Sequence, residues 1–165
     1  MKAVSNTTPL RYLIAIELEH LFGQLFEKVF VPVAVHEELT DSRTPEAVRG
    51  RVLSMPAWFE VRTVQEPETT PFPATLHRGE RQAILLAEAL RPDVLLIDEQ
   101  IGRTIALSRN LPLSGTLGTL ERADTMGFVS DFSQVLQQLK ASGFFITQAL
   151  EQQLFDRHHT RRKPR

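Results

Sequence analysis

Short apolar runs alternate along the chain with longer segments whose apolar residues recur every three or four positions. The short runs predict strands at residues 2–5, 29–31, 61–64, 94–97 and 113–114. Residues 94–97 are apolar at every position, which is typical of a central strand in a parallel sheet, covered on both faces. The chain should therefore contain at least one fully buried strand.

The segments between these runs have helical spacing. They predict helices at residues 8–22, 33–39, 46–53, 79–90, 102–109, 116–126, 131–141 and 147–155. At the first of them, Thr7 or Thr8 can cap the helix and Pro9 suits its first turn. Strands that alternate with helices indicate an α/β fold with a mostly parallel sheet. Residues 66–73 contain three prolines and are expected to form an internal loop.

Length and composition fit one domain with a sizeable core, since the chain has 165 residues and 42% of them are hydrophobic. The chain contains no cysteine, which excludes disulfides and thiolate chemistry. No apolar run approaches the ~20 residues that span a bilayer, and the N-terminus lacks the apolar stretch of a signal peptide. We expect a cytoplasmic protein without membrane contact.

The net charge of −1 hides an uneven distribution. Five of the 19 basic residues and no acid lie in residues 157–165, so residues 1–156 carry the other 14 against all 20 acids, a net −6. We expect a domain over residues 1–156 and a basic tail over residues 157–165. The tail is either an arm that binds phosphates or a solvated chain end.

Oxygen-bearing side chains stand near the ends of the predicted strands and helices. The candidates are Asn6, Glu38, Glu80, Asp98 and, in an auxiliary role, Glu99. In parallel sheets, ligands bind beyond the carboxyl ends of the strands, where such side chains can meet. Carboxylate and amide oxygens are what Mg²⁺ and Mn²⁺ prefer.

Each candidate also has a structural explanation. Asn6 suits a helix N-cap, Asp98 could cap the helix that follows it, and Glu80 lies in a first turn, where the helix dipole favours any acid. Glu99 alternates away from Asp98 and could face solvent. Glu38 lies near a helix end that disfavours an acid, so its placement points more strongly to function.

Six segments in order resemble the PIN-domain superfamily, and in particular a prokaryotic branch described as predicted nucleic-acid-binding proteins. The segments are residues 5–10, 31–39, 79–84, 96–99, 115–118 and 142–146. The resemblance implies a three-layer α/β/α sandwich whose parallel sheet has its first and fourth strands side by side. It also implies hydrolysis of RNA with Mg²⁺ or Mn²⁺, often by the toxin of a toxin–antitoxin pair.

Carried over by position, the catalytic set is Asn6, Glu38, Glu80 and Asp98, with Glu99 as a further metal ligand. The family normally has Asp where this chain has Asn6. Partners implied are RNA, a small antitoxin-like protein and a second copy of the chain, through helices 8–22 and 46–53.

For nucleic acid, the expected contacts are Thr7, Thr116, Arg157, Arg161, Arg162 and Lys163. The leading interpretation is a divalent-metal-dependent ribonuclease. The alternative is a PIN-like module that binds nucleic acid or a partner without cutting. A phosphotransferase is disfavoured because the chain has no G-x-x-x-x-G-K-[ST] phosphate loop.

Overall fold

A computed structural model describes residues 1–69 and 71–162. Its five strands form one parallel sheet in the order β3-β2-β1-β4-β5. The strands are β1 (Lys2–Ser5), β2 (Lys28–Pro32), β3 (Phe59–Arg62), β4 (Val94–Leu96) and β5 (Leu113–Ser114). The expected neighbours β1 and β4 pair directly, with Val4 opposite Leu95. The strand order reverses at this pair, so its carboxyl edge is where a ligand is expected.

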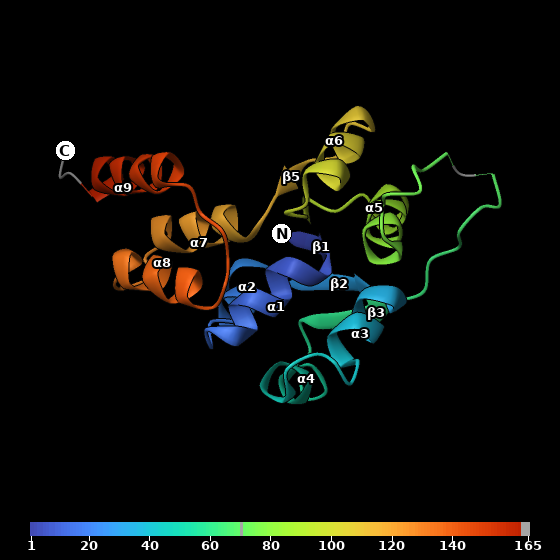
Figure 1. The fold of residues 1–165 in the computed structure, drawn as a ribbon, viewed down its shortest axis with the longest axis horizontal. Helices are drawn as coiled ribbons and strands as arrows, with labels where there is room; N and C mark the ends of the chain where they lie inside the picture. The colour runs from blue at the N-terminus through green and yellow to red at the C-terminus, as the bar shows by residue number, and fades with distance from the viewer. Residues whose placement is uncertain (70, 163–165) are drawn as a thin grey trace.

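Helices cover both faces of the sheet (Figure 1), which gives the three-layer α/β/α sandwich. They are α1 (Thr7–Ala15), α2 (His20–Leu25), α3 (Val33–Thr40), α4 (Glu46–Val52), α5 (Arg78–Leu90), α6 (Gln100–Ser108), α7 (Thr116–Thr125), α8 (Phe132–Ala141) and α9 (Gln148–Arg162). Helices α5 and α6 lie on one side of the sheet, and α1, α2, α7, α8 and α9 lie on the other.

Two separate hydrophobic cores result, one on each face. The first core joins the sheet to α1–α4 and α7–α9, and the second core joins it to α5 and α6. Strand β4 contributes side chains to both cores, because Val94 and Leu96 belong to the first core while Leu95 belongs to the second. This confirms the expectation that the apolar run at residues 94–97 is covered on both faces.

The predicted helix 8–22 is wrong in one respect, because it is two helices. Helix α1 is closed by Glu17, whose φ of 59° is left-handed. The amide of Leu18 donates to Leu13 O at 2.8 Å and that of Glu17 to Ile14 O at 3.0 Å, the pattern of a Schellman motif. Apolar spacing continues across the break because Leu21 enters the same core as Leu13.

Other element boundaries also differ from expectation. Strand β3 begins at Phe59 rather than at residue 61, in register with Val29 of β2. Helix α9 runs to Arg162, beyond residue 155 where the predicted helix ends. In the described part of the chain, no helix has the length and apolar character needed to cross a bilayer.

Candidate active site

A cleft of about 570 Å³ opens at the carboxyl edge of the sheet. Its lining comes from the turn after β1, the first turns of α1, the end of α3, the start of α5 and the turn after β4. The lining residues are Asn6, Thr7, Thr8, Arg11, Tyr12, Glu38, His77, Glu80 and Glu99. We call this the acidic cleft. It brings together Asn6, Thr7, Glu38, Glu80 and Glu99 from the sequence-based candidates.

Asn6 and Glu99 meet because β1 and β4 are neighbours, and the Asn6 amide continues the ladder by donating to Leu96 O at 2.9 Å. The side-chain Nδ2 of Asn6 donates to Glu99 Oε2 at 2.9 Å, and Thr8 Oγ1 donates to Glu99 Oε1. Both carboxylate oxygens of Glu99 are therefore held in the cleft. Glu99 was expected only in an auxiliary role. It is the acid after β4 that lines the cleft.

Glu38 reaches the cleft from α3, and Thr7 Oγ1 donates to its Oε2 at 2.6 Å. Its other oxygen lies over Gly79, where a β-carbon would collide with it. Helix α3 is fixed against α5 by the buried Gln82, which accepts from the Ala34 amide at 3.0 Å. The close contact of α3 with α5 therefore places Glu38 beside the start of α5.

Glu80 is 5% exposed and accepts from the His77 amide at 2.8 Å, as part of a capping box at the start of α5. Burial raises the pKa of the Glu80 carboxyl, and the negative charges of Glu99 and Glu38 raise it further, against the lowering effect of the His77 bond. The three carboxylates thus interact electrostatically across one cleft.

Asp98 is placed differently. Its Oδ1 accepts from the Thr116 amide at 2.9 Å and its Oδ2 from Thr116 Oγ1 at 2.6 Å. It caps α7, and Gly115 allows this approach because a β-carbon there would collide with Oδ1. Burial raises the pKa of Asp98 above its ordinary value, because the bonds from Thr116 only partly oppose the loss of solvation. Among the described residues that line the acidic cleft, Glu99 is present and Asp98 and Thr116 are not.

The donor set of the cleft suits a hard divalent cation, because carboxylates, an amide and hydroxyls surround it. Within residues 1–69 and 71–162, no three His, Asp or Glu side chains lie close enough together to hold an ion as they stand. The Glu38 and Glu99 carboxylates are instead hydrogen-bonded to Thr7, Thr8 and Asn6. These bonds compete with a cation for the same oxygens.

Within the described part of the tail, Arg157, His158 and Arg161 are bound to acids of α7. Arg157 Nε lies 2.7 Å from Glu121 Oε1, and Arg161 Nη2 lies 2.9 Å from Asp124 Oδ2. His158 Nδ1 also contacts Asp124, at 2.7 Å. Burial raises the pKa of Asp124, but the bonds from His158 and Arg161 outweigh burial and lower it overall.

Any phosphate contact by these arginines has to compete with the ion pairs to α7. Arg162 Nη2 lies 3.6 Å from Asp124 Oδ1 with a half-exposed side chain. Lys163, the remaining nucleic-acid candidate, lies outside the described residues.

Removing residues 157–165 should therefore lower the free energy of unfolding by about 1–3 kcal/mol, because Glu121 and Asp124 lose the cations that pair with them. Denaturant unfolding measures this, with a chain ended after Arg162 as the matched control that keeps the ion pairs. Equal stability of the two truncated chains would show that the pairs contribute nothing.

Several residues of the site were not found by sequence reasoning. His77, Tyr12 and Arg11 line the cleft, and Gln82 and Gly79 set the distance between α3 and α5. Arg11 and Tyr12 follow Thr8 within one helical turn, so the spacing alone could have placed them on the cleft wall. Gln82 had no comparable signal, since its partner, Ala34, is distant in sequence.

The sequence also matches a known protein family. A family model described as a PIN domain matches residues 2–160. The chain belongs to the PIN domain family. Among solved structures, it is similar to a PilT N-terminus domain protein, SSO1118, from the hyperthermophilic archaeon Sulfolobus solfataricus P2. The identity is 14%, the TM-score is 0.49, and the match covers 89% of this chain and 98% of that one. No curated protein matches this sequence. The family membership supports a nuclease-type fold for this PIN domain.

Proposed function

We propose that this PIN domain is a ribonuclease that hydrolyses phosphodiester bonds with Mg²⁺ or Mn²⁺ held in the acidic cleft. The proposal rests on one observation above all. Glu38, Glu80 and Glu99 come from three separate parts of the chain and line one cleft at the carboxyl edge of β1 and β4. Three acids in one cleft repel one another, which favours a cation between them.

The residues of the cleft have distinct roles in this proposal. Glu38, Glu80 and Glu99 would hold the cation, with Asn6 as a neutral oxygen donor. The hydroxyls of Thr7 and Thr8 orient the carboxylates of Glu38 and Glu99. A bound divalent cation supplies the positive charge that polarises the phosphodiester and acidifies water. The first turns of α1 then form the wall against which an RNA strand is positioned.

Asn6 favours a second candidate, a PIN domain that binds nucleic acid or a partner protein without cutting it. Its amide neutralises no charge and binds one oxygen of Glu99. The site consequently has one formal negative charge fewer than a site with Asp at this position. Cleavage of mixed RNA in the presence of Mn²⁺ separates the two candidates.

Beyond the chemistry, we propose a cytoplasmic toxin that pairs with a small antitoxin-like protein and forms a homodimer. Family membership supports these roles. A small open reading frame next to the gene, whose product blocks cleavage and co-purifies with this chain, would support the toxin role. Sedimentation of the purified protein would test the homodimer.

Glu80→Gln tests the acidic cleft because it should raise the stability of the metal-free protein and lower both Mn²⁺ binding and cleavage. The raised pKa means that the folded state binds the Glu80 proton more tightly than the unfolded state. Stability is therefore lost as pH rises from the unfolded pKa through the folded one, and the full penalty applies above the folded pKa. Glu80→Gln removes this penalty, so Tm without metal should rise at pH 7 by about 2–4 °C, as for ~1 kcal/mol in a domain of this size.

The same variant should lose Mn²⁺ stabilisation and about 10²-fold of the cleavage rate. The control is Glu46→Gln, which changes an exposed acid in the first turn of α4. Thermal melts at pH 4 and pH 7 with and without Mn²⁺, together with RNA cleavage, give all the readouts. A wild type that neither gains stability from Mn²⁺ nor cleaves RNA would overturn the proposed function.

A further inference from the structure

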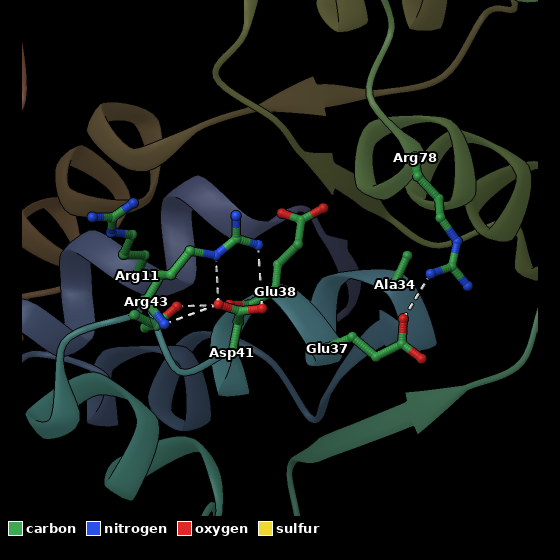
Figure 2. Close-up of a pocket in the computed structure, with 8 residues that line it drawn as sticks. Arg11, Ala34, Glu37, Glu38, Asp41, Arg43 and Arg78 are labelled. Carbon is green, nitrogen blue, oxygen red and sulfur yellow. Dashed lines mark hydrogen bonds and ion pairs between the residues drawn. The ribbon is translucent and has the colours of Figure 1, made fainter.

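A second pocket, of about 330 Å³, adjoins the acidic cleft and shares Arg11 and Glu38 with it. We call it the arginine pocket. Its charged residues are Arg11, Arg43 and Arg78, with Glu37, Glu38 and Asp41 (Figure 2). Because Arg11 and Glu38 line both pockets, the two pockets lie side by side next to α1 and α3.

Two of the three arginines in the arginine pocket are already paired. Arg43 Nε lies 2.8 Å from Asp41 Oδ1, and Arg78 Nη1 lies 2.7 Å from Glu37 Oε2, as Figure 2 shows. The guanidinium of Arg11 has no ion pair or hydrogen bond to any residue that the structure describes. Arg11 is exposed, so its charge is available to a ligand from solvent.

The position of Arg11 relates it directly to the acidic cleft. It follows Thr7 by four residues in α1, so the two side chains lie on the same face of the helix. Thr7 in turn binds Glu38, the residue common to both pockets. The unpaired guanidinium of Arg11 therefore belongs to a residue one helical turn from Thr7, whose hydroxyl binds the Glu38 carboxylate.

We infer that Arg11 binds a backbone phosphate of the RNA strand next to the phosphate that is cut. This rests on the proposed ribonuclease function. The planar guanidinium offers a pair of parallel donors that match two phosphate oxygens. A cleft with three carboxylates repels a polyanion, and a free arginine at its margin offsets that repulsion where the strand leaves the cleft. Phosphates repeat along the strand, so one of them reaches Arg11 while its neighbour occupies the cleft.

Arg11→Gln should weaken binding of a labelled single-stranded RNA and make it less dependent on salt. Loss of one phosphate contact reduces the slope of log affinity against log salt by about 0.7 for a single strand. Affinity should fall most at low salt, and Arg11→Lys should keep most of the slope. Fluorescence anisotropy in Ca²⁺ buffer, from about 50 to 200 mM salt, measures this without cleavage.

The control is Arg91→Gln, an exposed arginine that precedes β4 and so lies toward the opposite edge of the sheet. An unchanged slope for Arg11→Gln, or an equal change for Arg91→Gln, would overturn this inference while the ribonuclease proposal stands. A wild type with no affinity for RNA in this assay would overturn both. Arg11→Gln should also raise KM for cleavage with little change in kcat, because it does not touch the reacting atoms.

Discussion

Glu99→Gln is expected to reduce Mn²⁺-dependent cleavage of RNA by about 10²-fold or more, whereas Asp98→Asn should retain most of the activity. Glu99 lines the acidic cleft, where Asn6 and Thr8 hold both of its oxygens. Both oxygens of Asp98 are engaged with Thr116. Asp98→Asn should change stability little, since it removes a desolvated charge and keeps a side-chain oxygen for the Thr116 amide.

Initial rates on a mixed single-stranded RNA at saturating Mn²⁺ distinguish the two variants. Melting temperatures show in parallel that each variant is folded at the assay temperature. Loss of activity in Asp98→Asn with activity kept in Glu99→Gln would return the metal-binding role to Asp98. That result would also require the Thr116 bonds to break on metal binding.

Asn6→Asp is expected to destabilise the metal-free protein by about 2–3 kcal/mol at neutral pH, and Mn²⁺ should recover most of the loss. The substitution replaces the donor that lies 2.9 Å from Glu99 Oε2 with a second carboxylate. Two carboxylates this close cannot both ionise without a cation, so the pKa of the pair rises. The deficit should therefore disappear below the unfolded carboxyl pKa values, grow as pH rises through those of the folded pair, and be complete above them.

Thermal melts across pH, with and without Mn²⁺, test this prediction, and RNA cleavage at low Mn²⁺ should increase. Asn110→Asp is the matched control, because it makes the same change at an exposed position after α6. If Asn6→Asp melts like the control at pH 7 without metal, Asn6 is not electrostatically coupled to Glu99. If wild type is inert at every Mn²⁺ concentration while Asn6→Asp cleaves, the natural protein is a binding module.

The arrangement of strands and helices could be predicted because it depends on local patterns. Apolar runs and helical spacing placed the strands and most of the helices, and the strand-end rule placed Asn6 and the residues after β4 at the same edge. The break after α1 was missed because the left-handed position that closes the helix is Glu17 rather than glycine. A glycine there would have marked the end of the helix.

The orientation of side chains at the site could not be read in the same way. Asp98 and Glu99 follow the last residue of β4, where strand alternation no longer applies and helical spacing has not begun. Which of them faces the cleft depends on Thr116, whose bonds take Asp98 to α7. The tail posed the same difficulty, since Arg157 and Arg161 pair with Glu121 and Asp124 on a helix distant in sequence.

The acidic cleft lies where two layers with separate hydrophobic cores meet. Glu38 is carried by α3, whose Val35 and Leu39 belong to the first core, and Glu80 by α5, whose Ala83 and Ile84 belong to the second. The two cores have no buried side chain in common, so the gap between these acids is set where α3 crosses α5 at Gly79. A small shear of one layer against the other would change the spacing of the acids without altering the sheet. Substitutions deep in either core are therefore expected to alter catalysis, although they touch no residue of the cleft.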